Sequence, residues 1–349
     1  MPVRCFIFLS ILTAILHAEN WPMWRGAKGS GVTTERNLPL KWSVKENIAW
    51  KIELPQRGNS TPIVWGNRIF LTQPLEKENR RTLMCLDRRD GRILWQRGIK
   101  YETKEETHRS NPYCSESPAT DGKRVVAVFG SAGVYCYDFV GKLLWKRDDL
   151  SSIEFEWGSA VSPVIHEDRV YIYRGPAKKA HLMALDLESG KTLWRVNDPP
   201  VQTVGRTDGF KGNRDTTAWI CSYATPLVIP HGNTEAVLMT TPGSIQAHEP
   251  ATGKVLWNCG GLNPLVYCSS IYGEKTVVAM GGFFGTSVAV TAGGKNDVTS
   301  THRLWQAVRT PNRLGSGVIH KGHVYVLNTA GILDCIEIKT GKVLFSERT

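Results

Sequence analysis

The stretch LMALDLESGKTLW, from Leu182 to Trp194, indicates how the whole chain folds. An apolar run leads to Asp186, a Ser-Gly pair follows, and a second apolar run ends in Trp194. Short apolar and β-branched runs on either side of turn residues are typical of two paired strands. The stretch therefore predicts a β-hairpin whose second strand ends in a large aromatic side chain.

The same pattern recurs along the chain, each time ending in an aromatic residue. The other copies are Leu83–Trp95, Val134–Trp145, Ile245–Trp257 and Leu333–Phe345, and a degenerate copy without the turn ends at Leu304-Trp305. The aromatic ends recur at intervals of roughly 40 to 60 residues, which is the range of blades in β-propellers. We interpret each copy as the outer half of one blade.

Two further strands precede each copy. In the third unit, Ser162-Pro163-Val164-Ile165 opens the first strand and Arg169–Tyr173 forms the second. Four strands per unit are typical of a propeller blade. The sequence therefore predicts an all-β fold, a β-propeller of four-stranded antiparallel blades. Its six visible repeats span about 58–97, 114–147, 159–196, 222–259, 267–307 and 315–346.

The tryptophans and glycines of the repeat are expected to be structural. The tryptophans should stack between adjacent blades, often donating their N–H to neighbouring backbone; they are Trp50, Trp95, Trp145, Trp194, Trp257 and Trp305. The turn glycines should adopt positive φ in two-residue hairpin loops; they are Gly91, Gly141, Gly190, Gly253 and Gly341. A carboxylate also recurs once per blade, which favours structure because a catalytic acid is needed only once.

Residues 1–18 have the pattern of a secretory signal peptide. Arg4 precedes an apolar run from Cys5 to Leu16 that is too short for a membrane span, and the small Ala18 precedes the expected cut. We therefore expect an exported protein, periplasmic or extracellular, with no membrane span after the leader.

Residues 19–46 form a glycine-punctuated, irregular segment, and residues 47–54 are expected to form the outer strand of an incomplete blade. This orphan strand, with Trp50 at the repeat position, would complete a sheet begun by the C-terminal end and so close the ring. Because the chain stops at Thr349, after the sixth repeat, either six blades close and the strand adds to an edge, or the chain lacks its last blades. We favour the second arrangement, with a propeller over 47–349.

Charge and cysteines point to no special partner. The formal net charge is +11, but the densest arginines fall at turns of the first repeat, where cations usually solvate an edge, so we expect no nucleic-acid partner. Cys85, Cys136 and Cys335 occupy the repeat position that holds Ala184 and Ala247 in other copies. Such interchange is typical of a small apolar residue in a crowded layer.

The repeat A/C-x-D/E-x-x-T/S/D-G-x-x-x-W resembles that of pyrroloquinoline-quinone (PQQ) type propellers over roughly residues 48–349. The N-terminal WPMWRG-x-x-G-x-G, followed by W-S-x-x-x-N-x-A-W-K, is similar to exported bacterial PQQ-like propeller proteins. The resemblance implies about eight blades and two functional classes. One is the quinoprotein dehydrogenases, which hold PQQ and calcium over the channel. The other is non-catalytic scaffolds, such as the propeller lipoprotein of outer-membrane β-barrel assembly.

Two long loops, 98–114 and 197–221, carry the candidate binding residues. Long loops on the face of a propeller are often functional, so we expect a protein or polymer partner there. The candidates are His108, Arg109, Arg206, Asp208, Arg214, Asp215 and Trp219.

A dehydrogenase would need calcium ligands, a catalytic carboxylate and basic residues for the carboxylates of the cofactor. Many relatives of that class also have a disulfide between adjacent cysteines. The chain has no Cys-Cys pair, and no spacing distinguishes its loop carboxylates as a calcium site. We therefore predict a non-catalytic binding scaffold without a cofactor. A PQQ- and calcium-dependent dehydrogenase, or a degenerate relative of one, is the alternative, and a structural remnant is a third hypothesis.

Overall fold

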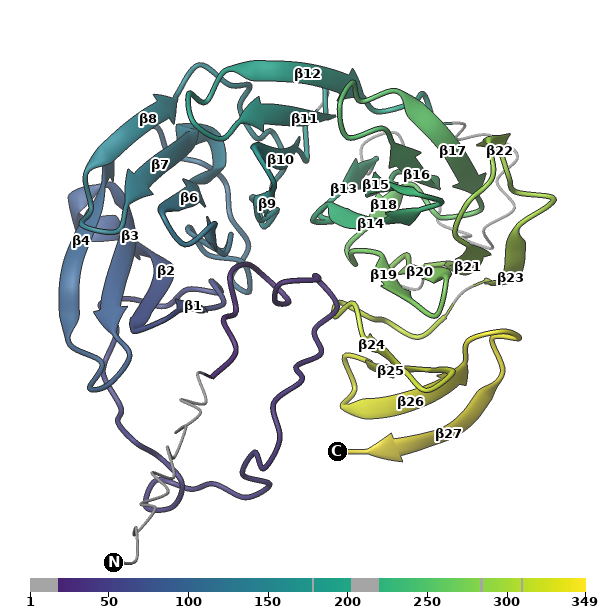
Figure 1. Ribbon diagram of the computed structural model, residues 1–349, viewed down its shortest axis with the longest axis horizontal. Helices are drawn as coiled ribbons and strands as arrows, with labels where there is room; N and C mark the ends of the chain where they lie inside the picture. Colours follow the sequence, from purple (N-terminus) through teal and green to yellow (C-terminus); the bar gives the residue numbers. More distant parts are fainter. Residues whose placement is uncertain (1–17, 178, 202–219, 283–284, 309) are drawn as a thin grey trace, which may run out of the picture.

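The computed structural model describes residues 18–177, 179–201, 220–282, 285–308 and 310–349. Within them, the regular structure is almost entirely β, in six main antiparallel sheets arranged around a common axis (Figure 1). The predicted all-β propeller is therefore confirmed. No helix in these described ranges is long and apolar enough to cross a membrane.

Each blade consists of consecutive strands, from the inner strand beside the axis to the outer strand at the rim. Blades 1 and 2 comprise β1 (Ile63–Trp65), β2 (Arg68–Leu75), β3 (Arg80–Asp87), β4 (Ile93–Lys100), and β5 (Ala119–Thr120), β6 (Arg124–Val128), β7 (Val134–Asp138), β8 (Leu143–Arg147). Blades 3 and 4 comprise β9 (Val164–His166), β10 (Arg169–Arg174), β11 (His181–Asp186), β12 (Thr192–Asn197), and β14 (Leu227–His231), β15 (Thr234–Thr241), β16 (Ser244–His248), β17 (Val255–Gly260). Blades 5 and 6 comprise β19 (Ile271–Gly273), β20 (Thr276–Met280), β21 (Ser287–Thr291), β23 (Arg303–Ala307), and β24 (Val318–His320), β25 (His323–Leu327), β26 (Ile332–Glu337), β27 (Val343–Arg348).

A small residue faces the aromatic residue of the outer strand in every blade. Cys85 lies opposite Trp95, and Ala184 lies opposite Trp194. The other blades pair Cys or Ala with an aromatic residue in the same register. A short side chain leaves room for the aromatic ring in a closely packed layer. The seven cysteines of the described residues are all buried, free thiols.

Most blade tryptophans pack against the turn glycine of the following blade. The Trp145 ring lies 2.6 Å from where a Cβ on Gly190 would stand, and its Nε1 donates to the Leu187 carbonyl at 2.9 Å. Matching ring contacts and N–H bonds are made by Trp50, Trp95, Trp194 and Trp305, which meet Gly91, Gly141, Gly253 and Gly341. The indole, the glycine and one hydrogen bond thus join neighbouring blades.

Blade 4 departs from this arrangement because blade 5 lacks the turn. The connection between β21 and β23 contains β22 (Asn296–Asp297), which pairs in parallel with β17 and gives blade 4 a fifth strand. Trp257 is fully buried, and its Nε1 has no hydrogen-bond partner in the part of the chain that the structure describes. Because the fifth repeat lacks the turn, the contact between blades 4 and 5 differs from the tryptophan–glycine contact of the other blades.

The loops between the third and fourth strands are longer than the two residues predicted. In blade 3, the Asp186 N–H bonds to the Lys191 carbonyl and the Gly190 N–H bonds to the Asp186 carbonyl, both at 2.8 Å, which leaves 187–190 as the loop. The Asp186 carboxylate accepts the N–H of Ser189 at 2.7 Å. The longer loop lets this acid cap the turn, which accounts for the carboxylate that recurs in every blade except blade 5.

A line of Ser and Thr hydroxyls joins neighbouring blades near the inner strands. The N–H of Ser117 bonds to the Ser162 hydroxyl at 3.0 Å, and the N–H of Ser162 bonds to the Thr225 hydroxyl at 3.1 Å. The same type of bond runs from Thr61 to Ser117, from Thr225 to Ser269, and from Ser269 to Ser316. These bonds satisfy backbone donors outside the strand ladders, so the recurring Ser or Thr forms a belt around the axis.

The segment before blade 1 contacts blades far apart in sequence. Trp21 and Val64 exchange two 2.8 Å backbone hydrogen bonds, the Thr120 N–H bonds to the Pro22 carbonyl, and Arg25 donates to the Gly317 carbonyl. In Figure 1 this segment lies in the opening between the first and last blades.

Residues 47–54 form no strand, unlike the prediction, because their backbone has no ladder partner among the described residues. Trp50 nevertheless packs on Gly91 and donates to the Arg88 carbonyl at 2.8 Å. The aromatic anchor of a blade is thus present without its strand.

Candidate functional site

The segments that lead into the inner strands meet at one end of the axis and surround a cavity of about 500 Å³, which we call the mouth pocket. Its lining residues are Asn59, His108, Ser110, Asn111, Trp157, Ala160, Tyr223, Tyr267 and Leu314. They come from the connections into all six inner strands. The loop face therefore has a concave site built jointly by the blades.

Three stacked aromatic rings form one wall of the mouth pocket. The rings of Trp157 and Tyr267 have centroids 6.0 Å apart at an interplanar angle of 24°, and those of Tyr267 and Tyr223 are 5.7 Å apart at 14°. Phe155 contacts Trp157 edge-on at 5.2 Å. Offset stacking of this kind stabilises the rings against one another and presents a broad apolar surface.

A short parallel sheet places the two tyrosines side by side. β13 (Cys221–Ser222) pairs with β18 (Leu265–Val266), and the N–H of Tyr223 bonds to the Val266 carbonyl at 2.9 Å. The two strands run in the same direction, so the residues that follow them, Tyr223 and Tyr267, lie next to each other.

The Tyr223 hydroxyl is buried without a partner. The residue is 9% exposed, and its Oη has no hydrogen bond among the described residues. Burial raises the pKa of both Tyr223 and Tyr267 far above the usual range, so both hydroxyls stay neutral. An unsatisfied buried hydroxyl costs about 1–3 kcal/mol. A ligand able to bond this group would recover part of that free energy.

The loop 98–114 is fixed beside the mouth pocket by a cluster of charged and aromatic groups. The Arg81 guanidinium lies 3.5 Å from the centre of the Tyr113 ring and 3.9 Å from the Glu105 carboxylate. The Tyr113 hydroxyl donates to the Glu105 carbonyl at 2.6 Å, and Asn111 donates to the Trp157 carbonyl at 2.7 Å. These contacts position the loop against the aromatic wall.

Two buried ionisable residues, Glu116 and Arg174, lie near this loop. Glu116 accepts the Gly130 N–H at 3.2 Å, and Arg174 donates to the Gly130 carbonyl at 3.0 Å. Burial raises the pKa of Glu116 and lowers the pKa of Arg174. Both side chains bond to backbone inside the blades, so their role is to hold the strand connections.

The candidate loop residues are distributed unevenly around the pocket. His108 lines it, with Nδ1 2.6 Å from the Ser110 hydroxyl, whereas Arg109 lines a shallow neighbouring hollow. The other candidates lie outside the described residues; they are Arg206, Asp208, Arg214, Asp215 and Trp219. The aromatic wall was missed, although two of its members, Trp157 and Tyr267, each stand directly before a Gly-Ser or Cys-Ser pair ahead of an inner strand.

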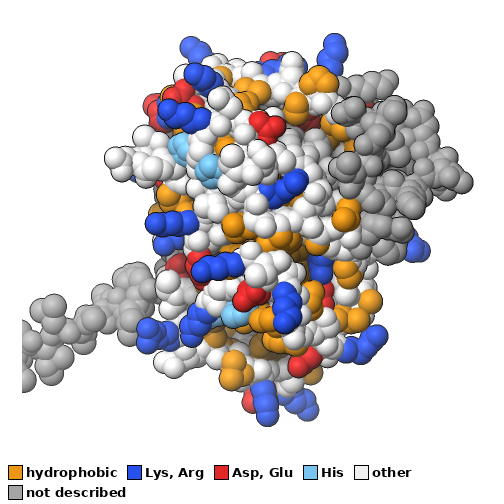
Figure 2. All heavy atoms as spheres, turned by 90° about the vertical axis from the view of Figure 1, so that its right-hand side faces the viewer, with side chains coloured by type: hydrophobic (Ala, Val, Ile, Leu, Met, Phe, Trp, Pro, Cys, Tyr) orange, Lys and Arg blue, Asp and Glu red, His pale blue; other side chains and the backbone are white. Residues whose placement is uncertain are grey.

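Positive charge is dispersed on the side of the molecule that Figure 2 shows. Figure 2 shows Lys and Arg spread over the side of blades 4 to 6, interspersed with acidic and neutral groups. Phosphate backbones are bound by continuous basic surfaces. The described residues on this side therefore form no continuous basic surface.

The fold and the mouth pocket define a β-propeller with PQQ-like repeats. The sequence profile of the family described as "Outer membrane protein assembly factor BamB" matches residues 79–347, and the chain belongs to this family. No curated protein sequence matches the chain.

Solved structures show the same fold at low sequence identity. BamB from Moraxella catarrhalis is 15% identical, with a TM-score of 0.56 over 86% of this chain and 77% of that one. A europium-containing methanol dehydrogenase is 10% identical, with a TM-score of 0.51 over 95% and 85% of the two chains. Quinohemoprotein alcohol dehydrogenase from Comamonas testosteroni is 11% identical, with a TM-score of 0.50 over 95% and 73%.

The mouth pocket lacks the charged groups that a calcium–quinone pair needs. None of the described residues that line it is an Asp, Glu, Lys or Arg. Calcium takes oxygen ligands, usually including carboxylates, and the carboxylates of PQQ would need cationic partners. The described residues of the pocket therefore do not fit PQQ with calcium.

Proposed function

We propose that the chain is a non-catalytic, exported scaffold that binds a protein or polymer partner on its loop face. The aromatic wall of the mouth pocket carries this proposal, because apolar aromatic surface in a concave site is typical of binding hot spots. The family description, an outer membrane protein assembly factor, supports a protein partner. The leader pattern in residues 1–18 supports export.

Cross-linking from the rim of the pocket tests the proposal. A photoreactive amino acid at Asn59 should cross-link the partner in cells that make the protein. Trp157→Ala should then lower the yield by tenfold or more, since a central aromatic anchor contributes about 2 kcal/mol or more. The control carries the photoreactive group at Val140, which is 71% exposed on the outer turn of blade 2. Equal yields from both positions, or no effect of Trp157→Ala, would contradict the proposal.

A quinoprotein dehydrogenase is the second candidate, favoured by the likeness in fold to a methanol dehydrogenase. Titration with PQQ and calcium, followed by calorimetry and absorbance, separates the two. One-to-one binding together with dye-linked alcohol oxidation would support the enzyme. Absence of both would leave the scaffold.

A further inference from the structure

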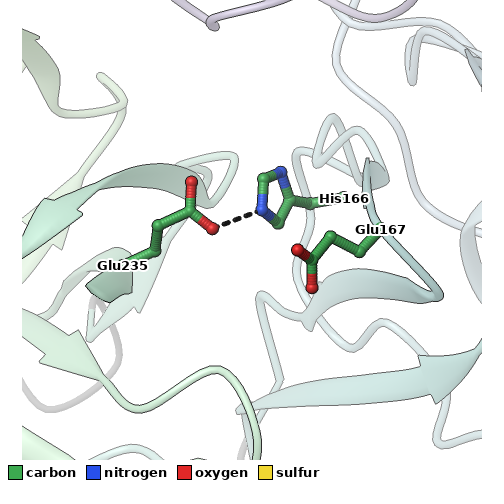
Figure 3. Close-up of side chains that lie close together, drawn as sticks. All are labelled: His166, Glu167 and Glu235. Atoms are coloured by element: carbon green, nitrogen blue, oxygen red, sulfur yellow. Dashed lines mark hydrogen bonds and ion pairs between the residues drawn. The ribbon is translucent and has the colours of Figure 1, made fainter. Parts of the chain in front are cut away.

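A histidine and two glutamates from blades 3 and 4 lie close together (Figure 3). They lie where inner strand β9 ends, whereas the mouth pocket is lined by the segments before the inner strands. His166 ends β9, Glu167 is the first residue of the turn into β10, and Glu235 lies near the start of β15. The His166 Nε2 is 2.5 Å from Glu235 Oε2, and one ligand atom of each residue lies within 4.8 Å of the others. We propose that these three residues bind a divalent transition-metal ion.

The turn position of Glu167 directs its carboxylate toward the following blade. Glu274 holds the equivalent place in blade 5, with φ +51 against +52 for Glu167, and it accepts the Gly322 N–H of blade 6 at 2.7 Å. Glu167 faces blade 4 in the same way. Its carboxylate has no hydrogen bond or ion pair among the described residues, so it is free to take a ligand.

The donor atoms suit zinc and similar ions. One imidazole nitrogen and carboxylate oxygens are ligands that Zn²⁺ binds at about 2.0–2.2 Å, whereas calcium and magnesium prefer oxygen alone. The side chains of His166 and Glu235 are 30% and 43% exposed, which leaves them able to rotate into ligating positions. Small rotations of these side chains would bring all three donor atoms onto one ion.

The proposed site opens onto a second cavity. His166 and Glu235 line a space of about 470 Å³ together with Trp24 and Lys28 of the N-terminal segment. Three protein ligands leave at least one position of a tetrahedral ion open. That position would face the cavity, where water or a small anion next to Lys28 could complete the coordination.

Metal titration of the purified, tag-free chain tests this site. Zn²⁺ should bind with a stoichiometry near one by calorimetry, and Co²⁺ should give the visible absorption of a four-coordinate N/O site. His166→Ala and Glu235→Gln should each weaken binding at least about tenfold, since even outer-shell changes cost about 10- to 100-fold. Glu167→Gln should weaken it as well.

The matched control is His320→Ala. His320 is the exposed residue at the equivalent position of blade 6, where Lys321 replaces the glutamate. Its removal should leave the affinity unchanged. Glu235→Gln preserves side-chain shape, so an unchanged melting temperature would separate lost ligation from lost folding. Equal Zn²⁺ affinity in the parent, His166→Ala and Glu235→Gln, or no saturable one-to-one binding, would show that the cluster is only an ion pair.

Discussion

At the residue scale, the contact between neighbouring blades requires a turn residue without a side chain. Gly190 has φ +70, and an added Cβ would stand 2.6 Å from the Trp145 ring. Gly190→Ala should lower the free energy of unfolding by roughly 2–4 kcal/mol, because backbone strain and overpacking add together. Denaturant unfolding followed by tryptophan fluorescence measures the loss.

Gly232 provides the matched control for this prediction. It has φ +62, but no atom lies within 4 Å of the Cβ position. Gly232→Ala should therefore cost only the strain, about 1 kcal/mol. If the two variants lose equal stability, the indole contact adds nothing and the glycine is needed only for its backbone conformation.

Asp198 should make stability depend on pH. Burial raises its pKa to about 6 from the usual 3.8, against the opposing effect of the Tyr173 hydroxyl that bonds to it. The folded state then holds the proton more tightly than the unfolded chain. The free energy of unfolding should fall as pH rises from about 4 to 6, by at most roughly 3 kcal/mol.

The test is to follow unfolding of the parent and Asp198→Asn between pH 4 and 7. Asn keeps the carbonyl that accepts the Tyr173 hydroxyl but cannot ionise. The variant should lack the fall seen in the parent. An identical slope in both proteins would assign the pH dependence to other groups.

At the scale of elements, the Ser and Thr belt holds the inner strands in register. Ser162→Ala removes the acceptor of the buried Ser117 N–H and should cost about 1–3 kcal/mol, the usual penalty for an unsatisfied buried group. Ser162→Thr restores a hydroxyl, as Thr225 supplies in blade 4, and should recover most of the stability. Loss of stability in both variants would indicate a steric effect instead.

Strands could be predicted from the sequence where their residue pattern repeats from blade to blade. Contacts that occur only once in the molecule could not be predicted. The apolar runs and turn residues around Trp194 recur in other blades, so their pattern indicates the blade. The parallel β13–β18 pair and the β22 addition each occur once and depend on tertiary position. A strand at 47–54 was predicted from Trp50, but an aromatic anchor can dock without a backbone ladder.

The choice of the loop face and of its candidate binding residues stays a prediction. The loop selected for its length contains His108, which lines the mouth pocket. The aromatic wall was missed because Trp157, Tyr223 and Tyr267 are separated by more than 40 residues in sequence, and only the ring of blades brings them together. Residues 202–219 of the second long loop lie outside the described residues.

At the scale of the whole molecule, the N-terminal segment connects distant blades through Arg25. Its guanidinium donates to the Gly29 carbonyl at 3.2 Å, to the Ser30 carbonyl at 2.9 Å, and to the carbonyl of Gly317 in blade 6. Burial lowers the pKa of this guanidinium, yet it remains charged at neutral pH. The charge-assisted bonds should therefore fix the segment against the propeller.

Arg25→Ala should release this segment while leaving the blades folded. The Trp21 amide, which bonds to Val64, should exchange hydrogen at least tenfold faster, because a lost charge-assisted bond costs about 1.5–3 kcal/mol. Arg36→Ala, at an exposed position with no hydrogen bond among the described residues, is the control and should exchange like the parent. Equal protection of Trp21 in both variants would mean that its pairing with Val64 holds the segment without Arg25, and the link from the first blade to the sixth would then contribute nothing to its docking.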